Sequence, residues 1–102
     1  MTEPVNEKVA APIRVVIADD HLLVREGLRS ILAVADDILL VGEASDGAKA
    51  IELAGTLSPE VMLMDLRMPR VDGMEAIRQI KARHPAIEIV ILTTYEDDAH
   101  IL

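Results

Sequence analysis

Four short apolar runs alternate along the chain with longer stretches in which apolar residues recur at helical spacing. The runs cover residues 13–18, 38–41, 61–64 and 87–92. They are rich in Val and Ile and mostly lack polar alternation, which is typical of strands covered on both faces in a parallel sheet. The exception is Glu88, which the end of a strand would tolerate. The pattern therefore predicts four strands.

The stretches between the runs predict three amphipathic helices, because their apolar residues share one helix face. Asp72, followed three residues later by Glu75, indicates the start of the third helix. Pro59 and Pro85 mark two returns to strand, since the residue before proline disfavours the α conformation. The three apolar faces consist of Val24, Leu28, Ile31, Leu32 and Ala35; of Ala50, Ile51, Ala54 and Leu57; and of Gly73, Ala76, Ile77 and Ile80.

The order β-α-β-α-β-α-β predicts an α/β fold, a doubly wound parallel sheet with right-handed crossovers. The acidic residues 96–98 could start a fourth helix. Residues 1–12 are polar and contain proline, so we expect a flexible N-terminal tail before one domain at 13–102. In open sheets of this kind, a ligand binds outside the carboxyl ends of the strands.

Composition narrows the possible functions. The chain has 102 residues, with 10 Lys and Arg against 18 Asp and Glu, and its net charge of −8 disfavours nucleic-acid binding by these residues. It contains no Cys, which excludes a thiol nucleophile and a Cys-based zinc site. Tyr95 is the sole aromatic residue, so no stacking platform for bases can form. The sequence shows neither a membrane helix nor a secretory signal, and we expect a cytoplasmic location.

Acidic and hydroxyl residues stand where three of the predicted strands end. Asp19 and Asp20 follow the first strand, Asp65 follows the third, and Thr93 and Thr94 end the fourth. If the first and third strands are neighbours, the three carboxylates converge and repel one another. Mg²⁺ would relieve that repulsion, and a carboxylate beside it could attack a phosphoryl group. The alternative is that each aspartate only caps the following helix.

These residues together resemble the receiver domain of bacterial two-component response regulators, specifically the NarL/LuxR-type subfamily. The resemblance covers residues 13–102 and implies a flavodoxin-like receiver with strand order 2-1-3-4-5. Its motifs are Asp19-Asp20-His21 continuing through Val24-Arg25-Glu26-Gly27-Leu28, Met64-Asp65-Leu66-Arg67-Met68-Pro69, Asp72-Gly73, and Leu92-Thr93-Thr94-Tyr95-Glu96-Asp97-Asp98.

The resemblance implies a role for each matching acidic residue. Asp65 would accept a phosphoryl group from a phosphohistidine of a sensor histidine kinase. Asp20 would bind Mg²⁺ directly, Asp19 would do so directly or through water, and Asp65 and the backbone carbonyl of Arg67 would complete the protein ligands. The chain would be a signalling receiver that catalyses only its own phosphorylation and dephosphorylation.

The resemblance assigns supporting roles to neighbouring residues. Thr93, with Thr94 as the alternative, would contact the phosphoryl group and move inward on activation. Pro69 and Gly73 would shape the loop that follows the phosphorylated aspartate. His21 would cap the first helix and line the pocket; a role as metal ligand or phosphate carrier is the alternative.

The family pattern continues beyond Leu102, with a fifth strand that carries a lysine, an aromatic switch residue and a fifth helix. We therefore interpret the chain as incomplete at its C-terminus, with supply of the missing elements by a partner as the alternative. In an incomplete chain the strand at 87–92 would be an exposed edge. A helix-turn-helix DNA-binding domain would follow downstream, and phosphorylation would favour a homodimer and regulate transcription.

Two other function classes compete with the receiver interpretation. A Mg²⁺-dependent phosphohydrolase on a similar sheet commonly carries a second acidic residue two positions after its nucleophile, where this chain has Arg67. A pure interaction module would not need Asp19, Asp20, Asp65 and Thr93 together.

Overall fold

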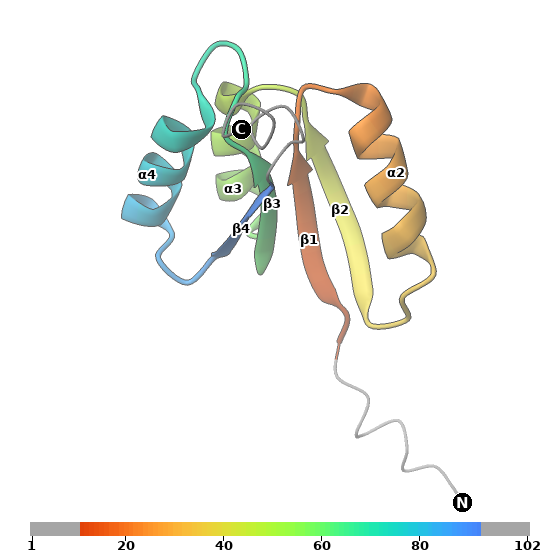
Figure 1. The fold of residues 1–102 in the computed structure, drawn as a ribbon. Coiled ribbons are helices and arrows are strands. Elements are labelled where there is room, and N and C mark those ends of the chain that lie inside the picture. The colour runs from red at the N-terminus through yellow and green to blue at the C-terminus, as the bar shows by residue number, and fades with distance from the viewer. Residues whose placement is uncertain (1–10, 93–102) are drawn as a thin grey trace, which may run out of the picture.

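The computed structural model describes residues 11–92, which form one parallel sheet with helices on both faces (Figure 1). The strands lie in the order β2-β1-β3-β4, so the predicted α/β class and the order of its first four strands are confirmed. The elements are β1 (Ile13–Ala18), α2 (Leu22–Ala33), β2 (Ile38–Ala44), α3 (Gly47–Leu57), β3 (Val61–Asp65), α4 (Gly73–Arg83) and β4 (Glu88–Leu92).

The register of the sheet brings the ends of β1 and β3 level with each other. Ala18 pairs with Met64, so the residues that follow them, Asp19 and Asp65, leave neighbouring strands at the same edge. On the other side of β1, the main-chain N–H of Asp19 donates to the carbonyl of Ala44 at 3.0 Å, which extends the pairing with β2. The central strands thus hold two acidic residues side by side.

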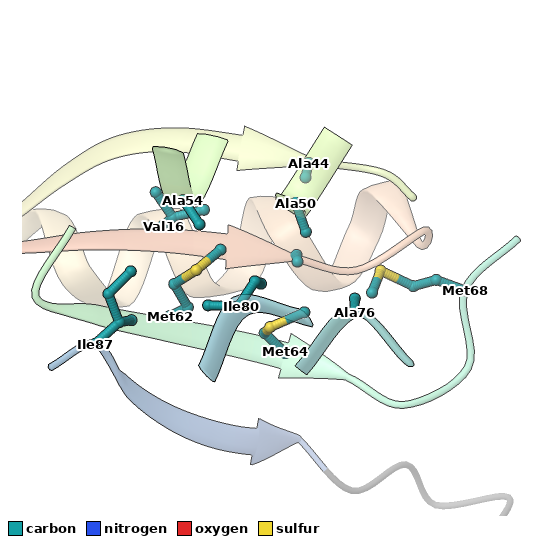
Figure 2. Packing of buried hydrophobic residues seen from close by; sticks show 11 residues of the cluster. Val16, Ala44, Ala50, Ala54, Met62, Met64, Met68, Ala76, Ile80 and Ile87 are labelled. Carbon is teal, nitrogen blue, oxygen red and sulfur yellow. The ribbon is translucent and has the colours of Figure 1, made fainter. Parts of the chain in front are cut away.

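The main core lies between the sheet and the helices α3 and α4 (Figure 2). Met62 and Met64 of β3 are fully buried against this pair of helices. Small side chains on the helices let them approach the sheet closely, and the long methionines fill the remaining space. These small residues are Ala50 and Ala54 of α3 and Ala76 of α4, all fully buried.

Helix α2 covers the other face of the sheet over β1 and β2 (Figure 1), and its apolar face is less buried than its periodicity predicts. No residue of α2 is fully buried within the described part of the chain. Val24 is 40% exposed and Ile31 is 65% exposed, while Ala35 lies beyond the end of the helix. Within residues 11–92, α2 is the one helix on this face, and much of its apolar surface has no packing partner there.

Strand β4 differs in the same way from a strand covered on both faces. Within residues 11–92 it pairs with β3 alone, as an edge strand, and Val90 and Ile91 are 47% and 49% exposed. The apolar run at 87–92 therefore correctly predicts a strand. The expectation that this strand is covered on both faces is not confirmed. None of the helices described is long and apolar enough to cross a membrane.

Two helices begin at aspartate caps. Asp72 accepts a hydrogen bond from the main-chain N–H of Glu75 at 2.9 Å, which confirms the predicted start of α4. Asp46 caps α3 in the same way, through the N–H of Lys49 at 2.8 Å. Helix α2 follows His21, whose side chain makes no capping hydrogen bond. His21 is thus the N-cap residue of α2, as predicted, but its main-chain carbonyl, which accepts the N–H of Arg25 at 3.1 Å, makes the cap, because its ring is engaged with carboxylates.

Candidate functional site

Three carboxylates converge at the carboxyl edge of the sheet, where the strand ends predict them. One side-chain ligand atom from each of Asp19, Asp20, His21 and Asp65 lies within 4.8 Å of the others. Asp19 and Asp65 are each 1% exposed, whereas Asp20 stands at the rim. The cluster thus has a buried floor made by two strands and an open side toward solvent.

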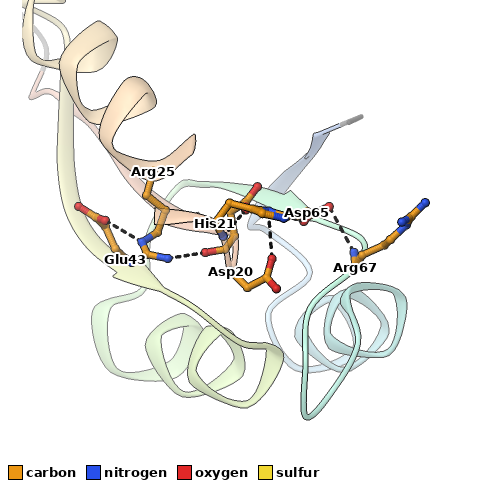
Figure 3. Close-up of polar contacts among 7 residues, drawn as sticks. Asp20, His21, Arg25, Glu43, Asp65 and Arg67 are labelled. Atoms are coloured by element: carbon orange, nitrogen blue, oxygen red, sulfur yellow. Dashed lines mark hydrogen bonds and ion pairs between the residues drawn. The ribbon is translucent and has the colours of Figure 1, made fainter. Parts of the chain in front are cut away.

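Asp65 has one satisfied and one unsatisfied carboxylate oxygen. Its Oδ1 accepts a hydrogen bond from the main-chain N–H of Arg67 at 3.2 Å (Figure 3). Its Oδ2 is buried and has no hydrogen-bond partner among the described residues. A buried acceptor without a partner costs about 1–3 kcal/mol. The site therefore contains an oxygen that a cation or a reacting group would stabilise.

Asp19 and His21 form the inner contacts of the cluster. Asp19 Oδ1 accepts the main-chain N–H of His21 and lies 2.8 Å from its ring Nδ1. The same Nδ1 lies 3.1 Å from Asp20 Oδ1 and 4.0 Å from Asp65 Oδ2. His21 therefore lines the pocket, as predicted, and its ring faces all three carboxylates.

The crowding of negative charge perturbs both kinds of titratable group. Burial raises the pKa of the Asp65 carboxyl above its ordinary value, and the charges of Asp19 and Asp20 raise it further. The hydrogen bond that Asp19 accepts from the ring raises the pKa of the His21 imidazole, and the charge of Asp20 adds to this rise. The cluster thus favours a positive charge among its carboxylates.

The donor set fits Mg²⁺. All three acidic residues offer oxygen atoms, and Mg²⁺ prefers a few carboxylates together with several waters. The buried, unpartnered Oδ2 of Asp65 is the strongest sign of such a ligand. Asp20, at the open rim, can reach the same ion as the two buried aspartates. These three residues are the ones that could hold the metal.

The loop between β3 and α4 packs tightly against two helix starts. The main-chain N–H of Gly73 donates to the carbonyl of Leu66 at 2.8 Å, and a Cβ at Gly73 would lie 2.3 Å from the carbonyl oxygen of Asp65. The carbonyl of Pro69 accepts the N–H of Gly47 at 3.4 Å. Pro69 therefore lies where this loop meets the start of α3, and Gly73 lies where the start of α4 meets the end of β3. Thr93 and Thr94 lie outside the described residues.

Sequence reasoning assigned no function to a cationic network beside the site. Arg25 of α2 donates to the main-chain carbonyl of Asp19 at 2.7 Å and to Glu43 Oε1 at 3.2 Å (Figure 3). Arg29 makes two hydrogen bonds to the same carboxylate, at 2.7 and 3.0 Å. The two arginines are four residues apart, which places them on one helix face. That spacing, with a glutamate near the end of the second strand, is the signal that could have found them.

The raised pKa of His21 predicts a pH dependence of stability in the metal-free chain. A group with a raised pKa in the folded state stabilises the fold fully below its unfolded pKa, about 6.5, and loses this effect as the pH rises through the folded pKa. We expect the free energy of unfolding to fall over this range, by less than about 1 kcal/mol, because half of the His21 side chain is exposed.

Urea unfolding at several pH values measures this effect. His21→Gln is expected to lessen the decline, whereas His84→Gln, at the far end of α4, is expected to retain it. An unchanged slope in His21→Gln would contradict the electrostatic role of this ring.

Comparisons with known proteins agree with the geometry. A model of the response regulator receiver domain family matches residues 15–102. Transcriptional regulatory protein YdfI of Bacillus subtilis is 49% identical over 85 residues, which cover 83% of this chain and 39% of the relative. Transcriptional regulatory protein DegU of Brevibacillus brevis is 40% identical over 101 residues, which cover 99% and 42%. The chain thus spans about two fifths of the length of these curated relatives.

Solved structures share the fold at moderate identity. The receiver domain of the putative response regulator NarL from Mycobacterium tuberculosis has a TM-score of 0.72 and 36% identity, and the match covers 80% of this chain and 64% of that one. The isolated receiver domain of RcsB from Salmonella enterica, solved with the phosphomimetic BeF3−, has a TM-score of 0.77 and 33% identity, with coverage of 88% and 67%. The order of the described strands therefore occurs in known receiver domains.

Proposed function

This chain belongs to the family of response regulator receiver domains, and on that premise we propose that Asp65 is its phosphoryl acceptor. The donor is the phosphohistidine of a sensor histidine kinase, and the reaction requires Mg²⁺. The observation that carries the proposal is the buried Asp65 Oδ2, which has no hydrogen-bond partner within residues 11–92 and lies in a cluster with two further carboxylates. A structural aspartate would be expected to satisfy that oxygen within the protein.

The residues of the pocket support an in-line transfer. A carboxylate oxygen of Asp65 forms a bond to phosphorus while the bond from phosphorus to the donor nitrogen breaks, which leaves an acyl phosphate on the protein. Bound Mg²⁺ would neutralise charge on the phosphoryl oxygens. The Arg67 N–H fixes the Asp65 carboxylate through Oδ1. Asp19, Asp20 and the carbonyl of Arg67 would supply the remaining protein ligands of Mg²⁺.

The wider role follows from this chemistry. We propose residues 13–102 as the receiver domain, with Thr93 or Thr94 responding to the phosphoryl group. Dimerisation on phosphorylation and control of transcription through a separate DNA-binding domain are parts of the same proposal. The relatives are named as transcriptional regulatory proteins, and the net charge of −8 disfavours DNA contact by these residues. The proposal also includes a cytoplasmic location, because histidine kinases use cytoplasmic ATP.

Intact-protein mass after incubation with acetyl phosphate tests the proposal. With Mg²⁺, the wild-type chain is expected to gain a single phosphoryl group that is lost in base, and chelation of the metal is expected to prevent the gain. Asp65→Asn should gain none, because its amide is not a nucleophile toward phosphorus. Asp36→Asn, which changes an exposed aspartate in the turn before β2, should be phosphorylated normally.

Two results would contradict the proposal. Phosphorylation that persists in Asp65→Asn would place the acceptor elsewhere in the chain. Steady release of phosphate from small phosphomonoesters, without a protein-bound phosphoryl group, would favour a phosphohydrolase.

A further inference from the structure

The side chain of Arg25 on helix α2 reaches the acidic site at the backbone of Asp19 and also pairs with the Glu43 carboxylate. Its guanidinium donates to the main-chain carbonyl of Asp19 at 2.7 Å. We propose that Arg25 is a positioning residue that sets the geometry of the Asp19–Asp20 pair for Mg²⁺. The inference rests on the proposed function, because it concerns the same metal site.

The contact falls on the peptide that joins the two aspartates. The N–H of Asp19 is already bound to the carbonyl of Ala44, which anchors the start of the residue to β2. The carbonyl of Asp19 lies beyond the end of β1 and accepts its hydrogen bond from Arg25. The carbonyl of Asp19 and the N–H of Asp20 belong to the same peptide plane. By holding this carbonyl, Arg25 sets the orientation of the plane, and the plane in turn sets the direction in which the Asp20 side chain leaves the backbone. Among the described residues, the one recorded contact of the Asp20 carboxylate is with His21.

Arg25 is itself held in place by Glu43. The Glu43 carboxylate contacts Arg25 at 3.2 Å and receives two hydrogen bonds from Arg29. The side chains of Arg25 and Glu43 are 16% and 23% exposed, whereas that of Arg29 is 46% exposed. A partly buried arginine that is held by a fixed carboxylate loses rotational freedom and can orient its second acceptor, here the carbonyl of Asp19. Arg29 belongs to the same network but, in the described part of the chain, donates to Glu43 and not to Asp19.

Positioning and charge predict opposite effects of removing Arg25. A cation near a divalent metal site repels the metal, so its loss would tighten Mg²⁺ binding by Coulomb's law alone. Loss of a group that orients a metal ligand typically weakens binding about 10- to 100-fold. The direction of the change in affinity therefore decides between the two roles.

Titration of the full chain with MgCl2, followed by amide proton–nitrogen spectra, provides the test. Arg25→Met is expected to weaken Mg²⁺ binding about tenfold. Arg29→Met is the matched control, because it removes the same charge and also frees Glu43, and it is expected to change the Kd less than about twofold. Arg25→Lys keeps the charge but not the forked donor geometry, so its Kd should fall between those of wild type and Arg25→Met.

The metal-free spectra give a second readout that a general loss of stability would not produce. The amide nitrogen of Asp20 shares its peptide with the Asp19 carbonyl, so its resonance should shift in Arg25→Met and stay in place in Arg29→Met. If Arg25→Met does not fold, Arg25→Lys carries the same comparison.

The outcomes separate the inference from the proposed function. Unchanged or tighter Mg²⁺ binding in Arg25→Met, or equal weakening in Arg29→Met, would overturn the positioning role while the receiver chemistry stands. A wild-type chain without saturable Mg²⁺ binding would overturn the proposed metal site itself, and the inference with it. Weakening confined to the Arg25 variants would support both.

Discussion

Gly47→Ala is expected to destabilise the fold by about 3 kcal/mol or more, at the upper end of the cost of overpacking. A Cβ at this position would lie 1.7 Å from the carbonyl oxygen of Val71 and 2.6 Å from its carbonyl carbon. The clash is with backbone, so it cannot be relieved by rotating a side chain. The loop from β3 to α4 would have to move away from α3, and the N–H of Gly47 would lose the Pro69 carbonyl.

Urea unfolding followed by circular dichroism measures this loss, and Gly27→Ala is its matched control. Gly27 lies in the interior of α2, and a Cβ there would meet nothing within 4 Å. Alanine in an exposed helix position is better than glycine by about 0.5–1 kcal/mol. The two glycine-to-alanine changes should therefore have opposite signs. A Gly47→Ala variant as stable as wild type would show that the loop does not pack on α3 in this way.

Asp65→Asn is expected to stabilise the metal-free chain by about 1–3 kcal/mol at neutral pH while it abolishes phosphoryl acceptance. The Asn side chain can still accept the Arg67 N–H, and its amide can donate toward Asp19 and Asp20, where the wild type places a third negative charge. The change thus removes the repulsion and the unsatisfied acceptor together. Functional sites commonly keep such a local cost in stability.

The pH dependence of this gain follows from the raised pKa of Asp65. A carboxyl with a raised folded pKa destabilises the fold once it ionises, so the cost is present above the folded pKa and disappears below the unfolded pKa. The advantage of Asp65→Asn should therefore shrink as the pH is lowered and the wild-type carboxyl becomes protonated. Thermal unfolding of wild type, Asp65→Asn and the exposed-site control Asp36→Asn at several pH values measures this difference in stability. Equal stability of wild type and Asp65→Asn at neutral pH would contradict the electrostatic account.

The acidic site could be predicted because its residues come directly after the apolar runs that form the strands. Asp19 and Asp65 each follow an apolar run, and parallel strands that are neighbours end at the same edge. The register of Ala18 with Met64 then brings the two carboxylates together. Local sequence therefore carried nearly all of the information needed to find the cluster.

The second strand was expected to end near Glu43 and Ser45, beyond its apolar run, and it ends at Ala44. The apolar run stops at Val41, but β2 continues through Gly42 and Glu43 to Ala44. Pairing with β1 carries the strand onward after a register shift between Val15 and Val16, and hydrophobicity gives no sign of it. Tertiary pairing thus extended an element whose own residues no longer favour it.

Two features of the site depend on contacts that side-chain patterns do not encode. The acceptor for Arg25 is the backbone carbonyl of Asp19, and every residue has such a carbonyl, so no motif marks the contact. The need for glycine at position 47 arises from Val71, which is distant in sequence and becomes a neighbour through packing of α3 and α4. Such close approaches become visible once the helices have been placed.

Borohydride trapping of the phosphorylated chain tests the central claim most directly. The reagent reduces an acyl phosphate of aspartate to homoserine, and peptide mass spectrometry then locates the changed residue. The account predicts homoserine at position 65 and unchanged aspartate at positions 19 and 20, in a reaction that requires Mg²⁺. Homoserine at position 19 or 20 instead, or a stable phosphoryl group on His21 that borohydride leaves intact, would contradict the assignment of Asp65 as the acceptor.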